Sequence, residues 1–251
     1  MAVPKRVGSE AVSDELSRYR ERTALPLGRA LIPSAGVGAT FTFIMTGLPV
    51  PALVAAAVTA LTAWLVVPRS FWSGGLDMPT LSPVDFSRWD RVRPFLPGAL
   101  AFGAGLLPGD GVIGEVPVWP FYFAGTTAAI LWTARAAGRR SEVVGRRRAR
   151  AALETTPLEE ATATRLRAAA EHREVLLGLT ALGAIDGIRA RVWKLAEVLN
   201  REESEVHGEV IALHRQGVVG VSTIDSGADT SRHLVEITPV GVRVLEELHR
   251  R

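Results

Sequence analysis

The residues best suited to chemistry in this sequence are acidic and histidine side chains near position 205. Glu203 and His207 are four residues apart and His214 follows seven residues later, so one face of a helix could carry all three. Carboxylate and imidazole groups at this spacing can hold a metal ion, but zinc sites use three or four ligands, often cysteines. The chain has no cysteine. We therefore interpret the three residues as solvated positions on a helix surface and predict no metal.

Other catalytic signatures are missing from the sequence. It has no glycine-rich phosphate-binding loop, no His-Glu-x-x-His pair and no nucleophile elbow. Its long apolar segments contain no Asp, Glu, Lys, Arg or His, unlike the ion path of a transporter or channel. We therefore expect neither an enzyme with catalytic residues nor a cofactor.

A second distinctive group is a run of arginines that follows the last apolar segment. Its members are Arg139, Arg140, Arg146, Arg147, Arg148 and Arg150. Arginines beside an apolar segment anchor a chain on anionic membrane lipids, and this is our interpretation. Contact with a nucleic-acid backbone is the alternative.

The segments that precede these arginines in the chain include an uncharged run from 30 to 68. A membrane helix needs about 20 apolar residues, and Gly47-Leu48-Pro49 would break the run near its middle. A second uncharged pair follows at 94–108 and 116–134. The sequence thus predicts an all-α membrane domain over residues 30–134, with four transmembrane helices as two hairpins.

Basic residues assign an orientation to this domain. Residues 1–29, 69–93 and 135–150 carry six, four and seven Lys or Arg, whereas the turns within the two hairpins carry none. By the positive-inside rule, we expect a multi-pass protein of the cell (inner) membrane with both termini in the cytoplasm. A re-entrant course of the short segment 94–108 would leave this orientation unchanged.

The rest of the chain forms three further parts. Residues 1–29 are predicted to be a cytoplasmic N-terminal segment with a short amphipathic helix near 12–22. Residues 135–170 are predicted to be a basic linker and helix, and residues 171–251 a small domain. Thr156-Pro157 favours the start of a helix that runs to about residue 182, which could pair with its copy in a homodimer.

Residues 171–251 show helical patterns followed by a hairpin and a last helix. Apolar residues recur at helical spacing over 192–200 and 204–216. Strand-like runs follow at 218–224 and 233–237, and Thr238-Pro239 predicts the start of a last helix.

This order resembles the winged helix-turn-helix domain of bacterial MarR-like and PadR-like transcription regulators. The resemblance is carried by Leu195-Ala196-Glu197, Ser204, Val206, Val210, Leu213, Gly217-Val218-Val219, Asp229, Arg232 and Glu236-Ile237-Thr238-Pro239-x-Gly241. It covers about the last 80 residues and none of the membrane half. It implies a small α+β winged helix-turn-helix domain that acts as a homodimer.

The resemblance also implies that the helix beginning near Ser204 enters the major groove of DNA. The residues then expected to contact DNA are Arg201, Ser204, His207 and Arg232. Against this, residues 171–251 carry ten Lys or Arg and thirteen Asp or Glu, whereas phosphate binding favours positive charge. Two functions stay open: a membrane-anchored transcriptional regulator that binds DNA, and a membrane-anchored scaffold whose acidic winged helix docks a cytoplasmic protein.

Overall fold

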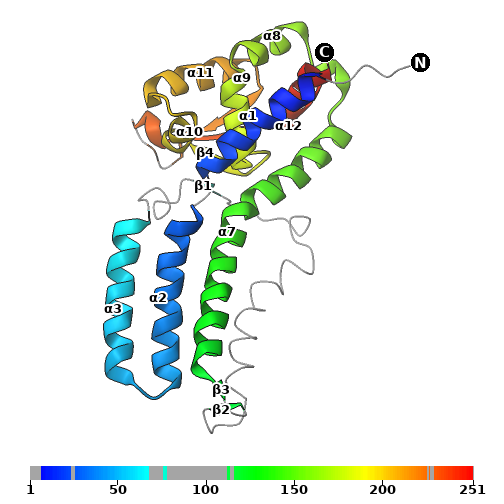
Figure 1. Cartoon of the computed structure of the whole chain (residues 1–251). Helices are drawn as coiled ribbons and strands as arrows, with labels where there is room; N and C mark the ends of the chain where they lie inside the picture. Colours follow the sequence, from blue (N-terminus) through cyan, green and yellow to red (C-terminus); the bar gives the residue numbers. More distant parts are fainter. Residues whose placement is uncertain are drawn as a thin grey trace, which may run out of the picture. The chain divides into compact units, whose positions relative to one another are not determined.

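The computed structural model forms two compact units (Figure 1). Unit 1 comprises Met1–Ala24, Ser73–Asp85 and Arg139–Arg251, and unit 2 comprises Leu25–Trp72 and Phe86–Gly138. The structure describes residues 7–23, 26–67, 76–77, 112–113, 116–224, 226 and 229–250.

Unit 2 is built around a pair of antiparallel helices, α2 (Leu27–Met45) and α3 (Pro49–Val66). The turn between them contains Gly47 at φ +74°, a conformation that glycine adopts without strain. The two helices approach closely, because a Cβ on Gly36 would lie 2.3 Å from the Thr59 hydroxyl oxygen. The break predicted at Gly47-Leu48-Pro49 is therefore the turn of a helical hairpin.

A third long helix, α7 (Trp119–Thr155), begins in unit 2 and ends in unit 1. Within unit 2 it packs on α2, since a Cβ on Gly38 would lie 2.2 Å from the Thr127 hydroxyl oxygen. Two short strands, β2 (Val112–Ile113) and β3 (Val116–Pro117), pair with each other before it.

The prediction of four transmembrane helices arranged as two hairpins is wrong. In the part of the chain that the structure describes, two helices are long and apolar enough to cross a membrane, Asp14–Met45, whose apolar part is α2, and Pro49–Val66, which is α3. The predicted span 116–134 is instead β3 and the start of α7, where Gly125, Thr126 and Thr127 make the helix less apolar. The predicted segment 94–108 lies outside the described residues.

Unit 1 contains a small antiparallel sheet in the order β1-β4-β6-β5. Strands β5 (Val219–Ser222) and β6 (Leu234–Ile237) form the hairpin. Strand β4 (Arg189–Arg191) pairs with β6 on its other side, and β1 (Leu76–Asp77) pairs with β4 at the edge. The chain between α3 and α7 therefore supplies a strand to the C-terminal sheet.

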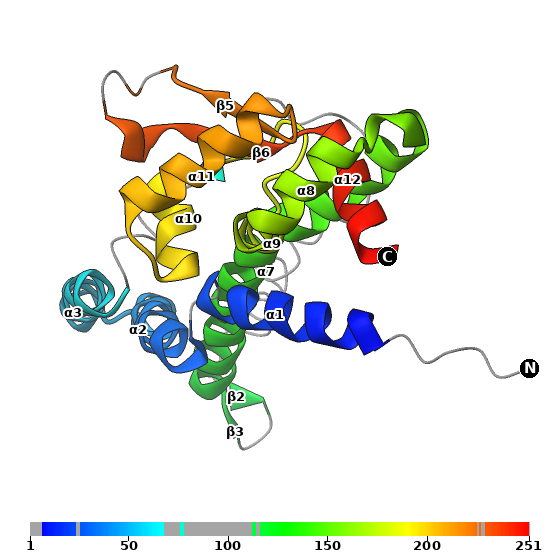
Figure 2. The same cartoon turned by 90° about the horizontal axis from the view of Figure 1, so that it is seen from above.

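The helices of unit 1 enclose one hydrophobic core with this sheet. They are α1 (Val7–Thr23), α8 (Ala163–Glu171), α9 (Arg173–Leu182), α10 (Val192–Leu199), α11 (Glu203–Arg215) and α12 (Pro239–Arg250), with short 3₁₀ turns η2 (Leu158–Glu160) and η3 (Thr230–Arg232). Leu176, Leu195 and Leu213 are fully buried between α9, α10 and α11. Figure 2 shows α11 beside α10, with β5 and β6 next to it.

The single helix predicted from Thr156 to about residue 182 is two helices. The N-cap is Thr162, whose hydroxyl accepts from the Arg165 amide, and the chain breaks again at His172 between α8 and α9. Most of α9 is buried in the core of unit 1. α9 therefore offers little surface for pairing with a second copy, and the homodimer stays a prediction.

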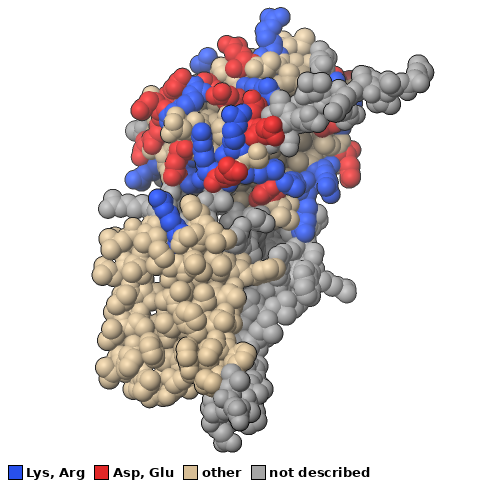
Figure 3. Space-filling view, viewed as in Figure 1, with Lys and Arg blue, Asp and Glu red and all other residues tan. Residues whose placement is uncertain are grey.

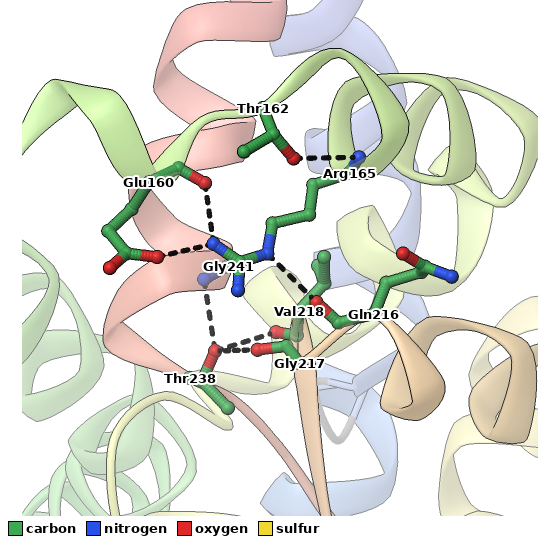
Figure 4. A network of polar contacts seen from close by, with 8 residues as sticks. All are labelled: Glu160, Thr162, Arg165, Gln216, Gly217, Val218, Thr238 and Gly241. Atoms are coloured by element: carbon green, nitrogen blue, oxygen red, sulfur yellow. Dashed lines mark hydrogen bonds and ion pairs between the residues drawn. The ribbon is translucent and has the colours of Figure 1, made fainter.

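A polar network fixes the C-terminal end of α11 to α8 and α12 (Figure 4). Arg165 Nε donates to the Gln216 carbonyl at 3.0 Å and also pairs with Glu160. Thr238 Oγ1 donates to the Gly217 carbonyl at 2.7 Å and accepts from the Gly241 amide at 3.0 Å. Thr238 is thus the cap of α12, and carbonyls that the end of α11 leaves without helical donors are satisfied.

Candidate functional site

The helix predicted to contact DNA is α11, and its position follows from its sequence. Val206, Val210 and Leu213 recur at helical spacing and are buried, which turns the opposite side outward. That side carries Glu203, Ser204, Glu205 and Gly208 as exposed residues at its start. The acidic first turn complements the positive end of the helix dipole. The exposed start of α11 is therefore acidic.

Arg201, in the turn before α11, is held by three carboxylates. Its guanidinium lies 2.6 Å from Glu205, 2.5 Å from Glu209 and 3.6 Å from Glu174 on α9. The hydrogen bonds that Arg201 donates to Glu205 and Glu209 raise the pKa of Arg201, and Arg201 in turn lowers the pKa of Glu205. The Arg201 side chain is only 21% exposed. Its positive charge is therefore paired with carboxylates of the same domain and is not available to a phosphate backbone.

His207 forms a pair with His233, the residue before β6. Its Nε2 lies 3.1 Å from Nδ1 of His233, and the two rings meet edge to face. At this distance one neutral ring donates its N–H and the other accepts. Burial, and then the charge of His233, lower the pKa of His207 below its ordinary value of 6.5. The pair therefore joins α11 to the hairpin in its neutral form.

Acidification is expected to weaken this pair. The pKa of His207 is lower in the folded chain, so the unfolded chain binds a proton at a higher pH and stability falls as the pH drops below about 6.5. Between pH about 7.5 and about 5.5, the free energy of unfolding of unit 1 should fall more in the native chain than in His207→Gln, by up to about 1.4 kcal/mol for one titrating group. Urea unfolding at both pH values measures this difference. His249→Gln, at the exposed end of α12, is the control and should keep the full pH dependence.

The other two predicted DNA contacts lie beside this pair, since Ser204 is three residues before His207 on α11 and Arg232 directly precedes His233. Ser204 is exposed at the start of α11. Arg232 is 60% exposed, and its Nε lies 3.0 Å from the Asp229 carboxylate. Among the contacts of the described residues, none joins two of the four predicted residues. Ser204, His207 and Arg232 therefore lie around the His207–His233 pair, and Arg201 and Arg232 are paired with acidic groups.

The arginines predicted to lie near the membrane are in the second half of α7. Arg146 pairs with Glu142, Arg148 donates to the Asp186 carbonyl, and Arg150 is exposed. The side chains of Arg139 and Arg140 lie outside the described residues. Figure 3 shows basic and acidic side chains intermixed over the visible face of unit 1. No continuous basic surface for a nucleic acid appears on that face.

The sequence alone does not indicate all the residues that pair with Arg201 and His207. Glu205 follows Arg201 by four residues, a spacing that predicts a helical ion pair. Glu174 and His233 lie 27 and 26 residues from their partners Arg201 and His207, so no local pattern indicates them. Comparisons of the chain with protein-family models, with curated proteins and with solved structures found no match, so the geometry of α11 itself carries the functional inference.

Proposed function

We propose that this chain is a membrane-anchored scaffold whose C-terminal domain docks a basic protein partner on the exposed acidic start of α11. The observation that carries the proposal is the pairing of Arg201 with Glu174, Glu205 and Glu209. This pairing neutralises the positive charge that directly precedes the start of α11. Glu202 and Glu203 are exposed beside it and have no ion pair among the described contacts. Their carboxylates attract Lys and Arg side chains and repel phosphate.

The exposure of α3 supports the membrane anchor. Its large apolar side chains point outward, namely Val50, Leu53, Val54, Val58, Leu61, Trp64 and Leu65, and only Ala52 is buried. A core helix of a soluble protein would bury such a face. With 18 residues, α3 is about 27 Å long, close to the thickness of the hydrocarbon layer. Arg29 is the only charged residue in 26–67.

The chain connectivity supports a hairpin anchor with both ends on one side. The residues before α2 and those that follow α3 both contribute to unit 1. Segments that flank a membrane hairpin on the same side can both join one domain, as they do here. The basic segments flanking α2 and α3 favour the cytoplasm as that side.

DNA binding is the second candidate function. It is favoured by the exposure of Ser204 at the start of α11 and by the resemblance to winged helix-turn-helix regulators. Serine at such a position can donate to or accept from a base edge. The acidic neighbours of Ser204 oppose this function through repulsion of the phosphates.

The experiment uses the full chain reconstituted in lipid vesicles and two fluorescent probes, a Lys- and Arg-rich helical peptide and a pool of duplex DNA fragments. We expect flotation with the vesicles and binding of the peptide that weakens with salt. Glu202→Gln combined with Glu203→Gln should weaken peptide binding by roughly three- to tenfold. The control, Glu154→Gln with Glu159→Gln, changes two exposed carboxylates outside α11 and should bind normally.

Each part of the proposal has its own contrary result. Chain that stays behind when the vesicles float would exclude the anchor. Selection of discrete DNA fragments, lost on Ser204→Ala, together with no peptide binding, would replace docking with DNA recognition.

A further inference from the structure

Helix α1 directly precedes the apolar hairpin in the chain. It ends at Thr23 and α2 begins at Leu27, so only residues 24–26 separate them. α1 belongs to unit 1 and α2 to unit 2. The sequence predicted a short helix near 12–22 but did not indicate what it would contact.

α1 packs against α9 and α10 (Figure 2). The Glu15 carboxylate lies 3.3 Å from Arg173 at the start of α9. Tyr19 packs against the hydrophobic core, and burial, followed by the nearby charge of Glu174, raises its pKa. Glu174 also pairs with Arg201. α1 therefore lies beside Glu174, one of the three carboxylates that pair with Arg201.

Arg22 makes the most specific of these contacts. Its Nη1 donates to the Val198 carbonyl at 2.9 Å, in the last turn of α10. Carbonyls in the last turn of a helix lack helical donors, so this bond satisfies one of them. Asn200 follows in the left-handed conformation at φ +58° and directs the chain into α11. Arg22 thus caps the helix end from which α11 departs.

We propose that α1 is a regulatory strap that passes displacement of the α2–α3 hairpin to the turn between α10 and α11. The use of this strap rests on the proposed function, in which α2 and α3 lie in a membrane and α11 binds a partner. With α1 docked, Arg22 holds the end of α10, and Arg201 stays with its carboxylates. When α1 is drawn away, the Val198 carbonyl loses its donor, and the turn opens more often.

The first test is hydrogen exchange of the full chain in vesicles. The amides of Asn200 and Arg201 donate to Glu197 and Ala196, so they report opening of the turn. In the Arg22→Ala variant, the hydrogens of these two amides should exchange roughly five times faster than in the native chain. Arg18→Ala removes an exposed arginine from the same helix and should leave them unchanged. Unchanged exchange in Arg22→Ala, or faster exchange throughout unit 1, would overturn the strap.

The second test separates the strap from the proposed function. Transfer from short-chain to long-chain phosphatidylcholine vesicles should alter exchange at Asn200 and Arg201 in the native chain. A flexible Gly-Ser insertion between residues 24 and 25 should abolish this response. If exchange at Asn200 and Arg201 in the native chain does not change with lipid length, the proposal of a regulatory strap is wrong, whether or not the basic peptide binds. If the response follows this pattern while the peptide fails to bind, the strap stands and the docking function falls.

Discussion

Gly183→Ala is expected to destabilise unit 1 by about 3–5 kcal/mol. Gly183 ends α9 at φ +71°, where an alanine costs about 1 kcal/mol in backbone strain. Its Cβ would also lie 2.3 Å from the Ser141 carbonyl oxygen and 2.5 Å from the Ser141 carbonyl carbon. These are backbone atoms of α7 and cannot rotate away, so α7 and the end of α9 must separate. Urea unfolding followed by circular dichroism measures the loss.

The matched control for this prediction is Gly208→Ala. Gly208 lies inside α11, and a Cβ there would meet nothing within 4 Å. Alanine is the better helix former, so this change should stabilise unit 1 by roughly 0.5–1 kcal/mol. Equal effects of the two substitutions would contradict the close approach of α7 to α9.

Short-range chemistry explains which elements could be predicted from the sequence. Asn200 and Gly217 both take positive φ values after α10 and α11, as their residue types favour. Thr238-Pro239 begins α12, because threonine can cap the helix and proline needs no amide donor there. Each signal acts within a few residues of the feature that it specifies.

Long-range pairing explains what could not be predicted. The two residues of β1 become a strand only because Leu76 lies opposite Ala190, more than a hundred positions later. β4 has three residues, too few for an alternating pattern. The predicted span 116–134 is wrong because an uncharged segment is not necessarily apolar enough to cross a membrane, and the start of α7 contains glycine and threonine.

In the candidate site, too, local features could be predicted from the sequence and long-range contacts could not. Ser204 and His207 lie on α11, as the helical pattern indicated. The chemistry of the predicted residues depends on distant partners, since Arg201 meets Glu174 and His207 meets His233. By residue type alone, Arg201 is a candidate to bind a phosphate group. Its three carboxylate partners show that it instead forms ion pairs within the domain.

Leu195→Ala is expected to destabilise unit 1 by about 3 kcal/mol, because Leu195 is fully buried and its loss leaves a cavity between α10 and α9. The facing residue is Gly178, where a Cβ would lie 2.9 Å from Leu195 Cδ1 and 3.0 Å from Leu199 Cδ2. Gly178→Ala alone should cost about 1 kcal/mol, since crowding of two side chains outweighs the gain in helix propensity.

The double substitution tests whether the two positions share one packing space. With Leu195 shortened, the methyl added at Gly178 can occupy part of the cavity, so the double variant should lose about 1 kcal/mol less than the sum of the single losses. Urea unfolding of the four proteins gives this coupling energy. Leu195→Ala combined with Gly208→Ala is the control pair and should be additive, because Gly208 has open space around it. Additive losses in the Gly178 pair would show that α9 and α10 do not meet at Leu195, and the core that positions α11 would then be arranged differently.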